Sequence, residues 1–306
     1  MIFGKKALLL SEINEVERIL SQTPIENVID IYGLQNRLDE LKAHLAILPD
    51  RIAEAEKLSL TFRGEPVRGS NAISADFAGK ASAAFVDAFT SILAGLKGSL
   101  QFSGPIPDKV NMPLMITGTA TGSFGFEMEL PGEQEDIFDR TASSGGAMEM
   151  FKSLLRLSAE GSDDEITDIV EEIHPRAVRK VADFLSTVSR GGAWCGLEFR
   201  NNYFKFDSLE QIRLSEERLK QENIIERKEV FFGEFLGFLP KSRNFEFLVA
   251  DSSETIRGRF GIDVENSQNL NSEFLSRRVR VQFDVIQVGQ GKPRYTLSST
   301  KDITIQ

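Results

Sequence analysis

The feature of this sequence that most constrains its fold is a change of hydrophobic periodicity along the chain. Apolar residues recur at helical spacing in the first segment, strand-like alternation mixes with helical stripes in the second, and short alternating runs dominate the third. One helical bundle or one sheet cannot accommodate all three patterns. We therefore predict an α+β fold with an N-terminal helical hairpin (1–57), a central mixed sheet with helices (58–227) and a small C-terminal β-barrel (228–306), SH3-like or OB-like.

The N-terminal segment predicts two helices. The run Thr23-Pro24-Ile25-Glu26 has the pattern of a capping box with proline at the first helical position, so we expect the second helix to begin there. Leucines then repeat at coiled-coil spacing, but over less than three heptads. Two interpretations stay open, a hairpin that packs on its own domain and an assembly seam for a dimer or partner helix. The seam residues are Leu34, Leu38, Leu41, Leu45 and Leu48.

The central segment combines both kinds of pattern. Residues 58–62 alternate as in a strand, and apolar residues from 73 to 92 recur at helical spacing. Ser162, followed by acidic residues, predicts a helix start. Ser208 opens a polar helix that we expect to extend to about Arg227, where we place the boundary to the third domain.

The C-terminal segment is rich in short strands. We predict strands at 230–239, 244–250, 255–260, 279–288 and 294–298. Such closely spaced strands are typical of a small barrel. The charge changes at the same place, because this segment holds 11 basic and 10 acidic residues while the rest of the chain holds 25 and 36.

Residues that perform chemistry are scarce. The single cysteine, Cys195, excludes an intrachain disulfide, and with only His44 and His174 beside it the chain lacks the ligands of a typical zinc site. No phosphate-binding loop and no Gly-x-Ser-x-Gly nucleophile pattern is present. Glu127 and Glu129 share a strand face, which is the polar side of a half-buried strand. We predict no cofactor and no metal, although an all-carboxylate Mg²⁺ site stays open.

The sequence shows neither an export signal nor a membrane span. The apolar run after Lys5 and Lys6 is only Ala7 to Leu10, whereas an export signal needs about 7–15 apolar residues and a spanning helix roughly 20. Together with the single cysteine, this predicts a cytoplasmic protein of bacterial type with no membrane contact.

Basic residues in the C-terminal segment lie among aromatic ones, as in OB barrels that bind single-stranded nucleic acid. In strands, residues two apart share a face, which groups 257 with 259 and 278 with 280. Solvated barrel faces are the competing interpretation, because the chain has a net charge of -10 and phosphate binding needs local positive potential. The candidate nucleic-acid contacts are Lys241, Arg243, Arg257, Arg259, Arg278, Arg280, Lys292 and Arg294.

These observations favour a protein that acts by binding other molecules. The lack of catalytic motifs, the leucine seam and the appended barrel predict a non-enzymatic interaction or assembly subunit of a bacterial cytoplasmic complex, which self-associates or binds a partner protein. A defence-type system would suit such a subunit. The first alternative is a nucleic-acid-binding protein that uses the barrel, and the second is a metal-dependent nuclease with ligands scattered in the sequence.

Overall fold

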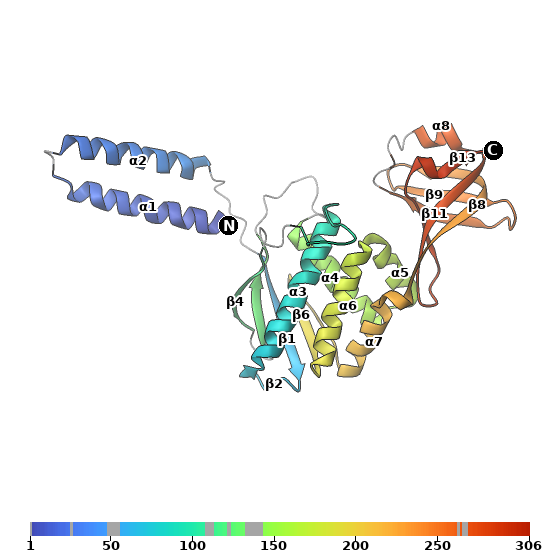
Figure 1. Ribbon diagram of the computed structural model, residues 1–306, viewed down its shortest axis with the longest axis horizontal. Coiled ribbons are helices and arrows are strands. Elements are labelled where there is room, and N and C mark those ends of the chain that lie inside the picture. The colour runs from blue at the N-terminus through green and yellow to red at the C-terminus, as the bar shows by residue number, and fades with distance from the viewer. Residues whose placement is uncertain are drawn as a thin grey trace.

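The computed structural model describes residues 2–24, 27–47, 56–107, 113–120, 124–131, 143–261, 264 and 269–306. The chain forms an N-terminal helix pair, a central antiparallel sheet with helices and a C-terminal closed barrel (Figure 1). Each part has a hydrophobic cluster of its own. The predicted α+β fold is confirmed.

The leucine seam holds the N-terminal helix pair together. Helices α1 (Ile2–Gln22) and α2 (Val28–Ile47) lie side by side (Figure 1). Ile13, Val16 and Leu41 are buried between them. The partly buried leucines that pack against these three are Leu9, Leu34, Leu38 and Leu45, while Leu48 lies outside the described residues.

The start of α2 differs from the predicted one. The Thr23 hydroxyl donates a hydrogen bond to the Ile19 carbonyl at 2.8 Å, so this threonine closes the end of α1. Asn27 instead precedes α2, and its carbonyl accepts from the Ile31 amide at 3.1 Å. Helix α2 therefore begins at Val28 rather than at the predicted Pro24, and Ile25 and Glu26 of the predicted capping box lie outside the described residues.

The central sheet is antiparallel throughout its described strands. The middle strand β1 (Lys57–Gly64) lies between β5 (Gly125–Glu129) and β6 (Ala193–Phe199), and β4 (Met115–Thr119) and β7 (Asn202–Lys205) form the edges. We expected a mixed sheet. It is antiparallel because β4–β5 and β6–β7 pair as sequence neighbours across short connections, and β1 lies antiparallel to both inner strands.

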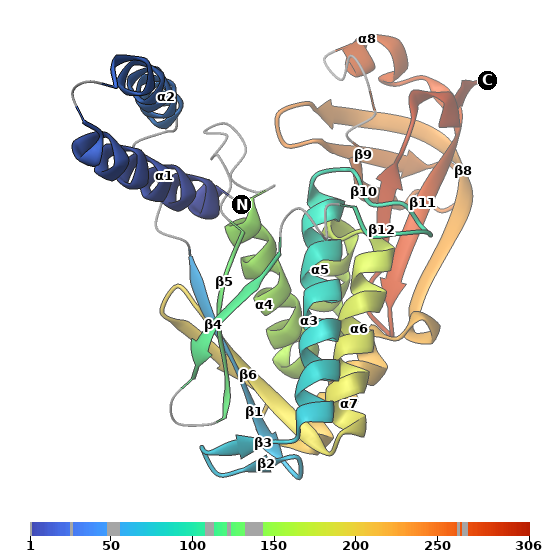
Figure 2. The ribbon, with the colours of Figure 1, turned by 60° about the vertical axis from the view of Figure 1, so that its left-hand side comes forward.

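Helices cover one face of this sheet (Figure 2). They are α3 (Ala75–Leu96), α4 (Ser144–Glu160), α5 (Asp163–Glu172), α6 (Pro175–Arg190) and α7 (Leu209–Leu219), and a small ribbon of β2 (Val67–Arg68) and β3 (Ala72–Ile73) precedes α3. Leu58, Leu60 and Phe62 of β1 are fully buried, whereas the residues between them are partly exposed. The alternation seen in the sequence therefore directs one side of the strand into the core.

Helix α3 is the central helix of this core. Among the described residues it alone is long and apolar enough to span a membrane, by length and composition. However, 61% of its most apolar window is buried inside the protein. Phe85 packs on Phe151 of α4 and Phe184 of α6, with ring centroids 5.2 and 5.5 Å away. Its apolar character is that of a buried core helix.

The C-terminal part is a closed five-stranded barrel. Its elements are β8 (Ile224–Leu239), β9 (Asn244–Val249), β10 (Thr255–Phe260), α8 (Leu270–Phe274), β11 (Arg278–Val288), β12 (Arg294–Leu297) and β13 (Ile303–Ile305). The ring runs β8–β9–β10–β12–β11 and closes where β11 pairs with β8, while β13 adds to β11 outside the ring. Only β10 and β12 are parallel among these described pairs. With a helix between the third and fourth strands, this connectivity is OB-like rather than SH3-like.

Phenylalanine fills the barrel. Phe235, Phe245, Phe247 and Phe283 are fully buried, and the rings of Phe245 and Phe283 stack with centroids 4.9 Å apart. The sequence contains 23 Phe but only 3 Tyr and 1 Trp. This bias supplies apolar area without polar groups that would need hydrogen bonds in the core.

The barrel is joined to the central part through the ends of two strands. Ile224, the first residue of β8, and Val288, the last of β11, pair with each other and belong to the central hydrophobic core. The Val288 amide donates to the Thr167 hydroxyl of α5 at 3.2 Å. We expected the polar helix to reach Arg227, but it ends at Leu219. The residues from Ile224 to Arg227 belong to β8 and pair with β11 instead.

Candidate functional site

The side chains of Cys195 and His174, which could take part in catalysis, lie in the core and at a helix cap. Cys195 lies in the core, where burial raises the pKa of its thiol to about 12. His174 caps α6, since its Nδ1 accepts from the Arg176 amide at 3.2 Å, and burial lowers the pKa of its ring. The side chain of His44 lies outside the described atoms. No three His, Cys, Asp or Glu side chains within the described ranges are grouped so as to hold a metal.

A groove of about 540 Å³ lies between α5 and the outer face of the barrel. Asp168 and Glu171 of α5 form one wall, and Leu236 and Leu239 of β8 contribute apolar side chains that are 48% and 59% exposed. Burial raises the pKa of Glu171, against the opposing effects of nearby Arg259, of the hydrogen bond from Thr296 and of Arg294. The groove thus combines apolar, acidic and basic groups.

The arginines of this groove are all paired with carboxylates. Arg257, Arg259 and Arg294 line it, as three of the eight basic residues singled out in the sequence. Their partners are Glu246 at 3.0 Å, Glu172 at 2.7 Å and Asp168 at 2.5 Å, respectively. The positive charge that we expected on this face is therefore balanced locally.

The basic residues in the turns of the barrel differ in their contacts. Arg243 donates to the main-chain carbonyls of Phe260 and Gly261 and lies over the Phe260 ring, 5.2 Å from its centroid. The backbone of Lys292 donates to Asp164 of α5 at 2.5 Å, while its side chain is exposed. Lys241 is exposed in the turn between β8 and β9. Arg243 therefore holds two loops together, whereas the side chains of Lys241 and Lys292 are exposed to solvent.

Arg278 and Arg280 lie elsewhere, on the outer face of β11. Both are exposed and flank the buried Val279, so they share the strand face predicted from their spacing. In the strand register Arg280 lies opposite Phe232 of β8, whose side chain is 43% exposed, and Arg278 lies opposite Glu234. We call Phe232, Arg278 and Arg280 the arginine face.

Sequence reasoning missed Phe232 and the acidic residues of α5 as parts of these surfaces. A signal for Phe232 was present, because Phe231 and Phe232 are adjacent in a strand and one of the two must face outward. Phe231 packs on Phe283 inside the barrel, with ring centroids 5.7 Å apart. Nothing in the sequence connected α5 to the barrel arginines, which lie more than 80 residues away.

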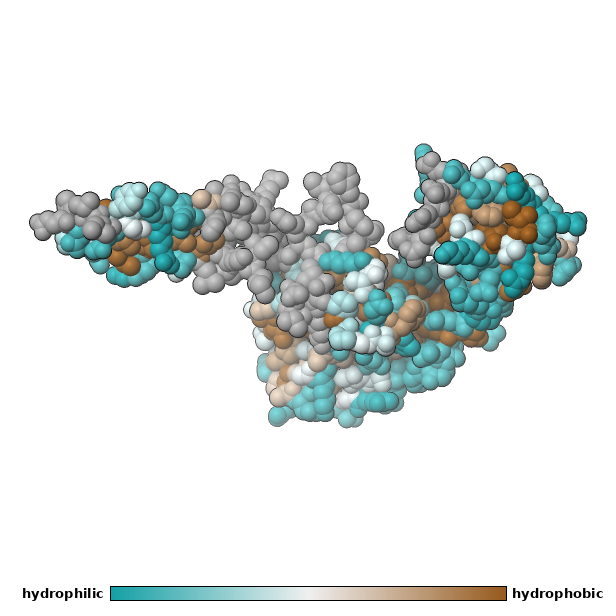
Figure 3. Space-filling view, turned by 45° about the horizontal axis from the view of Figure 1, so that its top comes forward, coloured by the Kyte–Doolittle hydropathy of each residue, from teal (hydrophilic) through white to brown (hydrophobic). Residues whose placement is uncertain are grey.

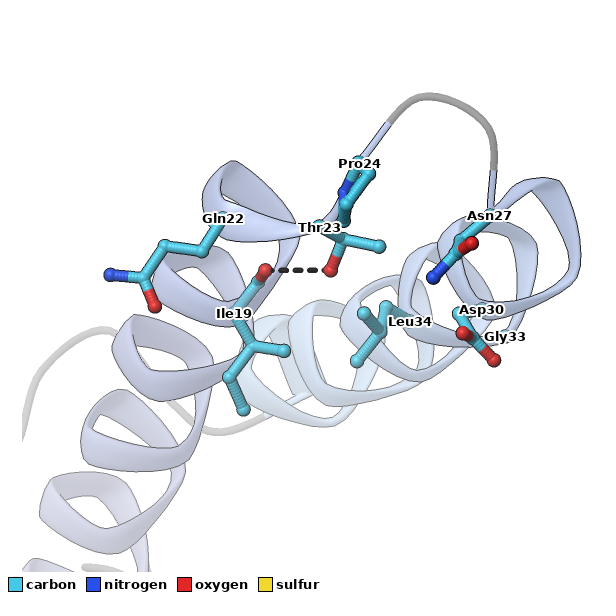
Figure 4. A pocket seen from close by; sticks show the side chains of 8 residues that line it. All are labelled: Ile19, Gln22, Thr23, Pro24, Asn27, Asp30, Gly33 and Leu34. Carbon is cyan, nitrogen blue, oxygen red and sulfur yellow. Dashed lines mark hydrogen bonds between the residues drawn. The ribbon is translucent and has the colours of Figure 1, made fainter.

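The N-terminal helix pair presents a third surface. A hollow of about 570 Å³ opens between the helices near their connection (Figure 4). Ile19 and Leu34 point into it, and a Cβ added to Gly33 would meet no atom within 4 Å. Apolar residues are visible at the surface of the pair among hydrophilic ones (Figure 3).

Comparison of the chain with family models, with curated proteins and with solved structures finds no match. The surfaces of the molecule that bear on its function are therefore the groove beside α5, the arginine face and the surface of the N-terminal helix pair.

Proposed function

We propose that this protein is a non-enzymatic assembly subunit whose N-terminal helix pair binds another protein chain, a second copy or a different protein. The observation that carries the proposal is the small core of the pair. Among its described side chains only Ile13, Val16 and Leu41 are buried, and they form a cluster separate from the other two. Most of the stability of a protein helix comes from tertiary packing of its apolar face, and so small a core supplies little of it. A partner would supply that packing.

The helix pair is large enough to serve as an interface. A helix of 20 residues is roughly 30 Å long, and two packed helices are roughly 20 Å wide. One face then offers about 600 Å² per partner, or about 1,200 Å² in total, the lower range of specific interfaces. Exposed apolar residues are already in place, since Ile19 is 39% and Tyr32 is 67% exposed.

The compartment and the biological setting that we propose are those predicted from the sequence. We place the protein in the cytoplasm as a subunit of a bacterial complex, with a defence-type system as one suitable setting. A metal-dependent nuclease gains no support, since the described residues contain no metal-holding group. Nucleic-acid binding by the barrel, the first alternative, is compatible with assembly and concerns a different surface.

The test compares full-length variants. Ile19→Glu combined with Tyr32→Glu places charge on the exposed surface of the pair, and Gln35→Glu, at an exposed position of α2, is the control. We expect light scattering of the purified protein, or cross-linking in cells, to show complexes that the double variant loses and Gln35→Glu keeps. A monomer that forms no complex in cells, or complexes unaffected by the double variant, would refute the proposal.

A further inference from the structure

The arginines of the barrel fall into two classes by partner. Five are paired with carboxylates or main-chain carbonyls, namely Arg227, Arg243, Arg257, Arg259 and Arg294. The other three, Arg277, Arg278 and Arg280, have no ion pair or side-chain hydrogen bond within the part of the chain that the structure describes, and all three are exposed. Arg278 and Arg280 share the outer face of β11, and Arg277 immediately precedes this strand.

Arg278 and Arg280 lie beside the exposed aromatic ring of Phe232. Arg280 lies directly between Phe232 of β8 and Thr304 of β13 in the strand register. Opposed residues of paired strands have Cβ atoms about 5 Å apart, so Arg280 and Phe232 are neighbours on the same face. Arg278 lies two residues along the strand, roughly 6.6 Å away, which is close to the spacing of phosphates in an extended single strand. Glu234 is the acidic residue opposite Arg278, so the face keeps an excess of positive charge.

The chemistry of this face fits a ligand with regularly spaced anions and planar rings. Guanidinium groups bind phosphate oxygens in a bidentate manner, and an exposed aromatic ring stacks on an unpaired base. An acidic protein segment would satisfy the arginines but offers no planar group to Phe232. We infer that the arginine face binds single-stranded nucleic acid, with Phe232 as the stacking platform and Arg278 and Arg280 as phosphate ligands.

Two sides of the barrel carry arginines, the groove beside α5 and the arginine face, and they differ in how those arginines are paired. The groove beside α5 also holds arginines, but Glu246, Glu172 and Asp168 already occupy them. A phosphate entering the groove would have to displace a carboxylate and would meet Glu171. On the arginine face no carboxylate has to be displaced. The binding surface therefore lies over β8 and β11.

The expected strength follows from the number of phosphate contacts. Two arginines that each release one counterion give a slope of log K against log salt of roughly -1.4 for a single strand. The net charge of -10 opposes binding at long range, so we expect modest affinity that is detectable at low salt. Loss of one stacking contact should weaken binding roughly tenfold.

The experiment measures fluorescence anisotropy of labelled oligo-dT and oligo-rU, and of a blunt duplex of the same length, with the full-length protein over a salt series. Arg278→Gln combined with Arg280→Gln should weaken single-strand binding at least tenfold and bring the slope from roughly -1.4 towards zero. Phe232→Thr should weaken binding and leave the slope unchanged. Arg257→Gln removes an exposed charge from the groove face and should have little effect.

Several outcomes would overturn the inference. They are no oligonucleotide binding at low salt, equal effects of Arg257→Gln and of the double variant, or binding of a labelled polyglutamate peptide to the arginine face in place of oligonucleotides. The last result would assign the face to an acidic protein. Thermal unfolding of each variant confirms that the barrel is intact. The outcome is independent of the proposed function, since assembly is measured by mass and depends on the helix pair.

Discussion

At the scale of single residues, the surroundings decide what an identical substitution does. Gly33 lies inside α2 with open space around the position of a Cβ, so its hydrogen serves no packing role. Gly191 follows α6, and a Cβ there would lie 2.5 Å from the ring of Phe77, which is buried in the core. One glycine weakens its helix, and the other permits close packing.

We predict that Gly33→Ala stabilises and Gly191→Ala destabilises the protein. Alanine in a helix interior is favoured over glycine by about 1 kcal/mol, whereas overpacking a core costs about 1–3 kcal/mol. Hydrogen exchange of α2 amides tests the first variant, and the urea midpoint of the central part tests the second. The same sign for both substitutions would show that the space around these glycines is not what decides their effect.

At the scale of elements, α5 connects the central part to the barrel through carboxylates in contrasting settings. Asp163 accepts from Arg218 at 2.8 Å and from the Gln290 amide at 3.1 Å, and the Arg218 hydrogen bond lowers the pKa of this carboxyl. Glu171, two turns further along, has its pKa raised by burial. The helix begins after Ser162, as predicted, and the structure shows a capping box there between Ser162 and Glu165.

We predict opposite pH effects at these positions. The stabilisation from Asp163 is present above its unfolded pKa of about 3.9 and is lost as the pH falls through its lower folded pKa. Asp163→Asn should therefore cost about 1–3 kcal/mol at pH 7 and little in acid. Glu171 favours folding when protonated, and this contribution is lost as the pH rises through its folded pKa. Glu171→Gln should therefore stabilise the protein at pH 7 and have no effect in acid.

Urea unfolding of the two variants and the parent over a range of pH checks both signs. Glu171→Gln serves as the control for removing a carboxylate from α5 without touching Arg218. A loss of stability in Glu171→Gln that grows with pH would contradict the assignment of burial as the dominant effect.

At the scale of the whole molecule, two kinds of contact hold the barrel on the central part. The ion pairs Arg259–Glu172 and Arg294–Asp168 are partly exposed, and such pairs contribute about 0–1 kcal/mol each. Val288 is fully buried in the central core. Apolar burial at this junction therefore dominates the coupling between the two parts.

We predict that Val288→Ala uncouples their unfolding, whereas high salt does not. The fluorescence of Trp194, the one tryptophan of the sequence, reports the central sheet, and far-ultraviolet circular dichroism reports the whole chain. The two transitions should coincide in the parent protein, also in about 0.5 M salt, which screens exposed pairs. They should separate in Val288→Ala, with a loss of about 2 kcal/mol. If salt alone separated the two unfolding transitions, the ion pairs would make the larger contribution to the coupling.

Local structure could be predicted from the sequence where it depends on residues close together in the chain. Alternation placed the strand at Thr255–Phe260, and Ser162 with Glu165 set the start of α5, because strand faces and helix caps depend on residues a few positions apart. The prediction failed at the start of α2, which begins at Val28, and at the end of α7, where the residues from Ile224 onward pair with the distant strand β11.

The tertiary structure alone decided which charges remain free. By sequence, Arg259 and Arg280 are equivalent basic residues on barrel strands. Folding brings Glu172 within 2.7 Å of Arg259 and leaves Arg280 beside Phe232 without a carboxylate partner among the described residues. Attraction between charges depends on their separation in space, and that separation is set by how the chain returns upon itself over many tens of residues.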